Sequence, residues 1–234
     1  MKKKRRVAVF DIDGTIFRSS LLIEITDALV ARGIFPKKVR GQYEKARQRW
    51  LDRKSSYENY IRAVINAFDS NIAGIHYKTF KKIAREVTAR RKDRVYRYTR
   101  DLVAGLNKKK YYLLAISHSP KGVADEFAKR LGFDKVYGRM LETDKDGVFT
   151  GKSMHAELIF DKAKVLRRAI EKENLTLRGS VGVGDTESDI PLLRMVKHPI
   201  AFNPNKKLYN HAKRHGWKIV VERKDVIYEL YERS

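Results

Sequence analysis

The sequence contains no cysteine, which excludes disulfide bonds, thiol catalysis, iron–sulfur clusters and zinc sites built from thiolates. Long apolar runs are also absent. The longest, Tyr111–Ile116, has six residues, whereas a membrane-spanning helix needs about 20. After the basic N-terminus, the run Val7–Phe10 is too short for the apolar part of a secretory leader, which needs about 7–15 residues. We therefore expect a cytoplasmic protein with no membrane span.

Acidic residues are scarce relative to basic ones. Asp and Glu number 28 against 52 Lys and Arg, so the net charge is +24. The hydrophobic content of 42% and the aromatic content of 10% are too high for a disordered basic tail, which favours a folded protein. The length of 234 residues fits one large domain or a core with an inserted unit. The excess charge is concentrated in residues 36–100, which hold 19 basic and six acidic residues.

The basic stretch is predicted to be helical throughout. Tyr57, Ile61, Val64, Ile65 and Phe68 recur at a spacing that places them on one helix face. The helices expected in this stretch cover Lys37–Leu51, Ser55–Phe68, Tyr77–Arg91 and Val95–Leu106.

The rest of the chain alternates between short apolar runs and helical patterns. The runs that predict buried strands are Val7–Phe10, Tyr111–Ile116, Ser180–Val183, Pro199–Phe202 and Trp217–Val221. Helices are expected at Lys162–Asn174 and at Ser119–Leu131, where Ser119 fits the N-cap and Pro120 the first helical position. This alternation predicts an α/β fold with a mostly parallel sheet, in which ligands bind at the carboxyl ends of the strands.

Polar residues follow the predicted strands at those ends. They are Asp11 and Asp13 after the first strand, Ser117 and His118 after the second, and Asp185, Ser188 and Asp189 after the strand that ends at Val183. Lys162 begins the helix that precedes this last strand. Carboxylates about 4 Å apart repel by roughly 4 kcal/mol per pair, so a cation must offset them. Oxygen ligands without His or Cys select a hard ion such as Mg²⁺, and a hydroxyl and an ammonium suit phosphate oxygens.

Each of these features alone has an ordinary structural explanation. Most Asp-x-Asp pairs form turns, Gly-Asp often only turns a strand, and Lys162 is one of many lysines. The combination, with every member at a predicted strand end or helix start, is much more specific.

These residues resemble the motifs of the haloacid dehalogenase superfamily. Motif I is similar to Val7-Ala-Val-Phe-Asp-Ile-Asp-Gly-Thr, motif II to Leu113-Leu-Ala-Ile-Ser, and motif IV to Gly182-Val-Gly-Asp-Thr-Glu-Ser-Asp. Lys162 and Lys164 compete for the motif III lysine, and the spacing of the phosphoserine-phosphatase-like branch favours Lys162. The resemblance implies a Rossmann-like core, residues 1–17 and 101–234, with an inserted all-helical cap of the C1 type, residues 18–100.

The resemblance also implies a role for each residue. Asp11 is expected to be the nucleophile that forms an aspartyl-phosphate, and Asp13 the general acid and base. Mg²⁺ is expected to bind Asp11, the backbone carbonyl of Asp13, and Asp185. Ser117 and Lys162 are expected to hold phosphate oxygens. Asp189 would position Lys162 or support the metal from outside its ligands, and Ser188 would contact the substrate. The expected activity is a Mg²⁺-dependent phosphomonoester hydrolase acting on a small phosphorylated metabolite.

Three departures from the phosphoserine phosphatase pattern bear on the substrate. Gly14 stands where the branch usually has serine, Ser20 replaces a glutamate that binds the substrate ammonium, and His118 replaces a glycine. Phosphoserine is therefore not the expected substrate. His118 has two open interpretations, contact with phosphate or leaving group, and simple space filling. Arg18 is a further candidate for a substrate contact.

Two alternative functions remain at this stage. A phosphotransferase would pass the phosphoryl group from the same intermediate to an alcohol instead of water. A nucleic-acid-binding protein would use the basic helices, among which Tyr43, Trp50, Tyr57, Tyr60, Tyr77, Tyr96 and Tyr98 are distributed. Tyrosines at helical spacing more often face a core, and charged helix faces are usually only solvated. Nucleic-acid binding is thus the less favoured interpretation.

Overall fold

A computed structural model describes residues 4–230 of the chain, so part of the basic N-terminal run lies outside the described residues. The strands are β1 (Arg5–Phe10), β2 (Tyr112–Pro120), β3 (Lys135–Thr143), β4 (Phe149–Met154), β5 (Leu175–Gly184), β6 (His198–Phe202), β7 (Lys218–Arg223) and β8 (Val226–Leu230). They form one sheet in the order β4-β3-β2-β1-β5-β6-β7-β8. The central strands are parallel, and β4 and β8 pair antiparallel at the two edges. The predicted α/β fold with a mostly parallel sheet is confirmed.

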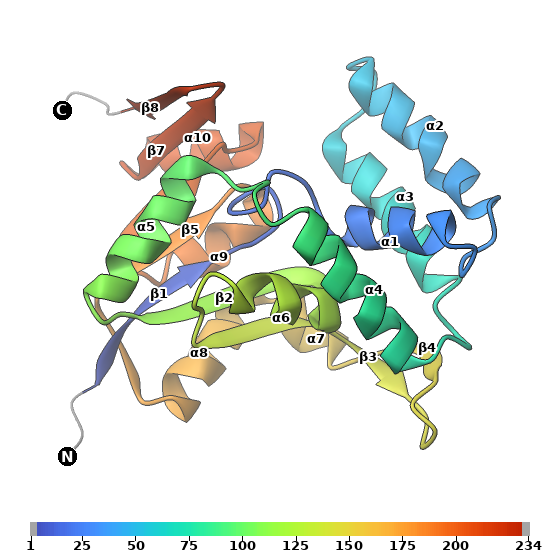
Figure 1. Ribbon diagram of the computed structural model, residues 1–234. Helices are drawn as coiled ribbons and strands as arrows, with labels where there is room; N and C mark the ends of the chain where they lie inside the picture. The colour runs from blue at the N-terminus through green and yellow to red at the C-terminus, as the bar shows by residue number, and fades with distance from the viewer. Residues whose placement is uncertain (1–3, 231–234) are drawn as a thin grey trace.

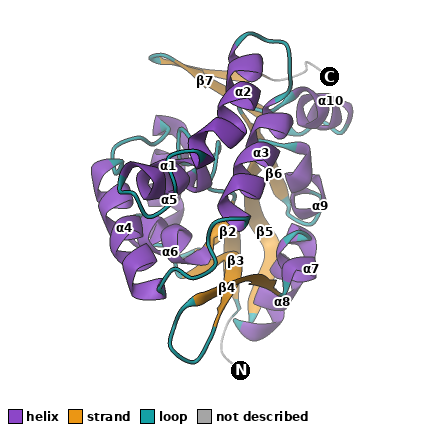
Figure 2. Ribbon diagram, turned by 90° about the vertical axis from the view of Figure 1, so that its right-hand side faces the viewer, coloured by secondary structure: helices purple, strands orange, loops and turns teal. Residues whose placement is uncertain are grey.

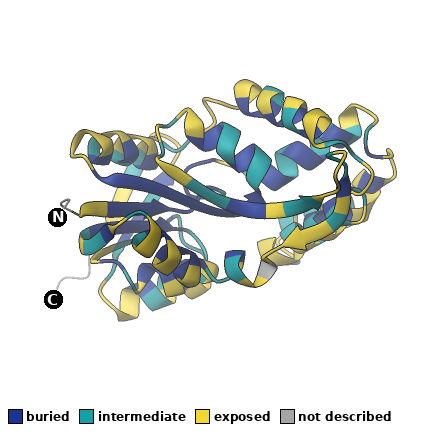
Figure 3. Ribbon diagram, turned by 90° about the horizontal axis from the view of Figure 1, so that it is seen from below, coloured by how far each residue is buried: buried dark blue, intermediate teal, exposed yellow. Residues whose placement is uncertain are grey.

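Helices cover both faces of this sheet (Figure 1, Figure 3). They are α1 (Leu21–Ala31), α2 (Val39–Leu51), α3 (Tyr57–Asp69), α4 (Tyr77–Arg90), α5 (Arg97–Lys108), α6 (Lys121–Lys129), α7 (Ala156–Ile159), α8 (Lys162–Lys172), α9 (Ile190–Leu193) and α10 (Lys206–Arg214), with a 3-10 turn, η1 (Glu187–Asp189), before α9. Within residues 4–230, no helix combines the length and apolar composition needed to cross a membrane.

Strand β1 lies in the middle of the sheet and is buried on both faces. Ala8 and Phe10 pack in the cluster beneath α1–α6, whereas Val7 and Val9 pack in the cluster beneath α8. Successive side chains of a strand point to opposite faces, so the short apolar run is fully covered, as a parallel sheet requires. The residue that follows Phe10 therefore emerges at the centre of the sheet's carboxyl edge.

All five predicted strands and the four helices predicted in the basic stretch are present. The structure adds β3, β4, β8 and the helices α1, α7, α9 and α10, which the sequence pattern did not indicate. Helix α1 is apolar except for Glu24, Thr26 and Asp27, so its helical periodicity is weak, and β8 is a largely exposed edge strand of only five residues. One prediction was wrong at its start. The helix expected from Ser119 begins at Lys121 with Pro120 as its N-cap, because β2 continues through Pro120.

Helices α1–α5 form the insert between β1 and β2. In the view of Figure 2, α2 and α3 lie in the middle. Helices α1, α4 and α6 lie to their left, and α7, α8 and α9 lie to their right. The link between α3 and α4 is tied to the β3–β4 hairpin, since Gly74 N–H donates to the Phe149 carbonyl and Tyr77 N–H to the Gly147 carbonyl. The predicted division at residue 100 falls within α5, which packs on β2. The cap boundaries at 18 and 100 stay a prediction.

Several aromatic residues of the basic stretch pack against other rings of the protein, whereas Tyr57 and Tyr77 are exposed. Tyr43 and Tyr60 are buried, Trp50 stacks on Tyr60 with ring centroids 5.6 Å apart, and Tyr98 stacks on Phe202. Rings committed to such contacts do not offer faces for base stacking. These four rings are thus not available for base stacking, and nucleic-acid binding by the basic stretch stays a less favoured prediction.

Candidate active site

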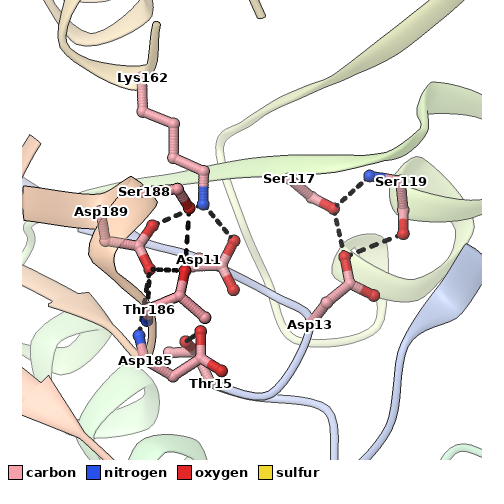
Figure 4. Close-up of polar contacts among 10 residues, drawn as sticks. All are labelled: Asp11, Asp13, Thr15, Ser117, Ser119, Lys162, Asp185, Thr186, Ser188 and Asp189. Carbon is pink, nitrogen blue, oxygen red and sulfur yellow. Dashed lines mark hydrogen bonds and ion pairs between the residues drawn. The ribbon is translucent and has the colours of Figure 1, made fainter. Parts of the chain in front are cut away.

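The candidate site lies where β1, β2 and β5 end. Strand β1 pairs with both neighbours in parallel, with Phe10 opposite Ala115 on one side and opposite Val183 on the other. Asp11 and Asp185 directly follow β1 and β5. The ends of β1 and β5 are therefore adjacent, and Figure 4 shows the side chains that converge there.

Lys162 begins α8, and its ammonium lies between two carboxylates. Its Nζ is 2.6 Å from Asp11 Oδ1 and 2.5 Å from Asp189 Oδ1, and all three side chains are almost fully buried. Burial alone would lower the pKa of Lys162, but the charges of Asp11 and Asp189, and hydrogen bonds to them, raise it above its ordinary value. Lys162 therefore remains an ammonium ion. The competing candidate Lys164 is exposed and pairs with Asp161.

Asp189 uses both of its oxygens within the protein. Oδ1 accepts the bond from Lys162, and Oδ2 accepts the backbone N–H groups of Asp185 and Thr186, each at 3.1 Å. The same carboxylate thus holds the loop after β5 and the ammonium of α8. This geometry suits a positioning role better than direct coordination of a ligand.

The carboxylates of this site fit a hard divalent cation. Asp11, Asp185 and Asp189 each offer an oxygen, and these oxygens lie within 4.8 Å of one another. Both oxygens of Asp189 already accept hydrogen bonds within the protein. The oxygens left to bind a cation are therefore those of Asp11 and Asp185, and among the described residues Asp185 Oδ1 accepts one bond, from Thr15 at 3.3 Å. Burial raises the pKa of Asp11 to about 7, with neighbouring carboxylates adding to the effect and the ammonium opposing it. An oxygen-preferring ion such as Mg²⁺ would offset this excess negative charge.

Gly14 explains one departure from the phosphoserine phosphatase pattern. Its φ angle is +80°, a conformation that strains any residue with a side chain. A Cβ atom at this position would lie 2.1 Å from Asp185 Oδ2. The placement of Asp185 against the turn after Asp13 therefore requires glycine.

Asp13 points away from the Asp11 cluster and toward the end of β2 (Figure 4). Its Oδ2 accepts bonds from Ser117 Oγ at 2.6 Å and Ser119 Oγ at 2.9 Å, and its Oδ1 accepts the N–H of Leu21 at 2.5 Å. Burial raises the pKa of Asp13, although the three hydrogen bonds oppose the rise. Ser119 was not identified from the sequence as a site residue. The available signal was its spacing, since residues i and i+2 of a strand share a face and Ser117 was already a candidate.

His118 lies between the two serines and contacts the other side of the sheet. Its ring centroid is 5.4 Å from that of Phe160, an exposed residue just before Lys162. Its Nε2 is buried and has no hydrogen-bond partner among the described residues. Burial, reinforced by the charge of Lys162, lowers the pKa of His118 to about 4, so the ring is neutral at pH 7. Both interpretations of His118 stay open.

Two further candidates lie at the margin of the cluster. Ser188 is exposed on η1, and its hydroxyl lies 2.9 Å from that of Thr186. Arg18 places its guanidinium over the ring of Tyr96, 5.2 Å from the centroid. Neither contacts the buried carboxylates directly, so substrate contact by Ser188 or Arg18 stays a prediction.

Comparison with known proteins supports a common origin for these features. A sequence model of haloacid dehalogenase-like hydrolases matches residues 8–194. The chain is 27% identical over 218 residues to the phosphoserine phosphatase SerB1 of Mycobacterium tuberculosis, covering 91% of this chain and 69% of the relative.

Two solved structures have a similar fold. A protein of unknown function from Bordetella pertussis Tohama I has a TM-score of 0.73 at 21% identity, covering 93% of this chain and 98% of that one. The phospho-aspartyl intermediate analogue of a phosphoserine phosphatase has a TM-score of 0.62 at 20% identity, covering 95% and 96%. The matched region, residues 8–194, includes Asp11, Ser117, Lys162 and Asp185.

Proposed function

Because the chain belongs to the haloacid dehalogenase-like hydrolases, in the phosphoserine phosphatase-like branch, we propose that it is a Mg²⁺-dependent phosphomonoester hydrolase with an aspartyl-phosphate intermediate. The proposal depends above all on one observation, the buried ammonium of Lys162 between Asp11 and Asp189 with Asp185 beside them. Three carboxylates around one ammonium leave a negative excess that a divalent cation would offset.

The residues divide the proposed reaction between them. A carboxylate oxygen of Asp11 attacks phosphorus, the bond from phosphorus to the leaving oxygen breaks, and Asp13 donates a proton to that oxygen. Asp13 then takes a proton from the water that attacks the phosphoryl group and releases Asp11. Ser117 and Lys162 bind the phosphate oxygens and stabilise their charge in both steps. Asp11, the Asp13 carbonyl and Asp185 would hold Mg²⁺, which neutralises phosphate charge.

The substrate is proposed to be a small phosphorylated metabolite other than phosphoserine. Ser20, which stands where phosphoserine phosphatases have a glutamate, is 3% exposed and carries no charge. The nearby Glu187 is occupied by Lys207 at 2.8 Å and by a hydrogen bond from Asn205. An ammonium on the leaving group would therefore lack a free carboxylate partner.

A panel of phosphomonoesters tests this proposal. Phosphate release is expected to depend on Mg²⁺ and to be faster with at least one sugar, polyol or nucleoside phosphate than with phosphoserine. Adding an alcohol as acceptor separates the two reaction types, since a phosphotransferase would form a new phosphoester. Absence of Mg²⁺-stimulated turnover over the whole panel would contradict the proposal. A preference for phosphoserine would contradict only the substrate assignment.

Metal binding is expected to stabilise the fold more strongly as pH rises. The folded-state pKa of Asp11 is raised from 3.8 to about 7, and burial also raises that of Asp185. Without metal, these groups favour the folded state when protonated, and that contribution is lost as pH rises from about 4 through 7. Mg²⁺ competes with those protons. Its affinity should therefore fall by up to about tenfold for each unit by which the pH is lowered, for each proton that it displaces.

Thermal unfolding with and without MgCl₂ measures this effect. The increase in melting temperature should be clearly larger at pH 8 than at pH 5, and Asp185→Asn should abolish it at both. An equal increase at the two pH values would show that the ion binds elsewhere than at the buried carboxylates.

A further inference from the structure

The structure surrounds the carboxylate of Asp13 with three donors that come from different parts of the chain. Ser117 and Ser119 belong to β2, and Leu21 is the first residue of α1, which begins the helical insert. The side chain of Ser20, the N-cap of α1, makes no capping hydrogen bond. Asp13 takes its place by accepting the first N–H of the helix, an end at which negative charge is favoured.

Ser119 connects these parts. Its side chain is 3% exposed, and its hydroxyl donates to Asp13 Oδ2 while accepting the N–H of Leu22 at 3.1 Å. Its own backbone N–H donates to Ser117 Oγ at 2.9 Å. Ser119 thus touches the candidate general acid, the candidate phosphate-binding serine and the start of the insert. Among the described residues, Ser119 is the one whose hydrogen bonds reach the side chains of both Asp13 and Ser117.

Substrate binding changes the demands on this arrangement. If Ser117 binds a phosphate oxygen, its hydroxyl proton is no longer available to Asp13. Oδ2 then keeps only the bond from Ser119, and Oδ1 keeps the bond from Leu21. These two donors are what remains to orient the carboxyl group while its proton passes to the leaving oxygen.

We propose that Ser119 is a positioning residue, which fixes Asp13 for proton transfer to the leaving group and couples it to helix α1. This inference depends on the proposed hydrolase function. A purely structural serine that only joins α1 to β2 would affect stability without regard to the leaving group. The nature of the leaving group therefore separates the two roles, since an alkoxide needs a proton and p-nitrophenolate departs without one.

The test compares kcat/KM of Ser119→Ala for an alkyl phosphate and for p-nitrophenyl phosphate. We expect a loss of about 10- to 100-fold for the alkyl phosphate, within the range of general acid catalysis, and less than about threefold for the aryl phosphate. Ser119→Thr, which keeps the hydroxyl, should restore most of the alkyl activity. The matched control is Ser180→Ala, a buried serine of β5 that donates to the Leu177 carbonyl and accepts the Lys197 N–H. It should leave both substrates unaffected.

A double-mutant cycle gives an independent measurement. In an Asp13→Asn background, adding Ser119→Ala should cost no further alkyl activity, because the partner through which it acts is gone. Equal losses on both substrates, no loss on either, or additive effects in the cycle would overturn the inference. An enzyme that lacks Mg²⁺-dependent turnover before any mutation would instead refute the proposed function.

Discussion

Replacing Asp11 by asparagine is expected to reduce turnover by about 10⁴-fold or more on the best substrate of the panel. Asparagine has nearly the same shape as aspartate, but its amide oxygen is a poor nucleophile toward phosphorus. The surrounding structure should survive, since Lys162 keeps its 2.5 Å contact with Asp189 and the site loses one of its mutually repelling charges. Phosphate release and trapping of the phosphorylated protein both measure the effect.

A matched aspartate elsewhere on the core provides the control for this variant. Asp125 lies on α6 and pairs with Lys121 at 2.7 Å, away from the carboxylate cluster. Asp125→Asn should leave turnover unchanged within about twofold, because an exposed ion pair of this kind contributes little. If Asp11→Asn kept more than about a tenth of the wild-type rate, an aspartyl-phosphate at this position would be ruled out.

The sequence predicts the candidate site because parallel strands bring their carboxyl ends to one edge of the sheet. Asp11, Ser117 and Asp185 each follow an apolar run, and the apolar run alone identifies the strand. No side-chain geometry is needed for this inference. Strand ends do not distinguish Lys162 from Lys164, because both lie in the first turn of one helix. The sequence favours Lys162 only through the spacing of the family motifs, and the burial of Lys162 appears only in the fold.

Ser119 and the β3–β4 hairpin show where sequence reasoning stops. A serine before proline and a helical pattern has the composition of an N-cap. Its spacing from Ser117 indicates a shared strand face only once β2 is known to continue past Ile116, and the contact of its hydroxyl with Asp13, 106 residues away, appears only in the fold. Strands β3 and β4 are part polar and partly exposed, because β4 forms an edge and β3 borders the insert. The side chains of these strands contact helices that are distant in sequence. For example, the buried Arg139 of β3 pairs with Asp69 of α3 at 2.7 Å.

The buried charges of the site are unbalanced without metal. Asp11, Asp185 and Asp189 share one ammonium, and burial raises the pKa of Asp11 and Asp185. Such a cluster is costly for folding, since burying a carboxylate without a partner carries a penalty of several kcal/mol. The ammonium of Lys162 offsets this charge through its ion pairs with Asp11 and Asp189, so we expect the residue to matter for stability as well as for the proposed phosphate binding.

Lys162→Met is therefore expected to lower the free energy of unfolding by about 3–5 kcal/mol at pH 8 without metal, because it leaves the carboxylates without their counter-charge. The loss should be smaller at pH 5. Removing the ammonium raises the folded-state carboxyl pKa values further above the unfolded value, so protonation favours the folded variant at low pH, and this contribution disappears as pH rises through those values. Turnover should fall by about 10²- to 10³-fold from the loss of charge stabilisation.

Lys164→Met is the matched control, with the same substitution two positions along α8. Lys164 is 60% exposed and lies 3.8 Å from Asp161, so its loss should change the free energy of unfolding by no more than about 0.5 kcal/mol at either pH. Urea unfolding of the wild type and of both variants at pH 5 and pH 8 provides the six free energies required. If the two variants were equally stable at pH 8, the three carboxylates would not depend on the ammonium of Lys162. That result would also contradict the proposed metal site, because the site is proposed on the excess negative charge of these carboxylates.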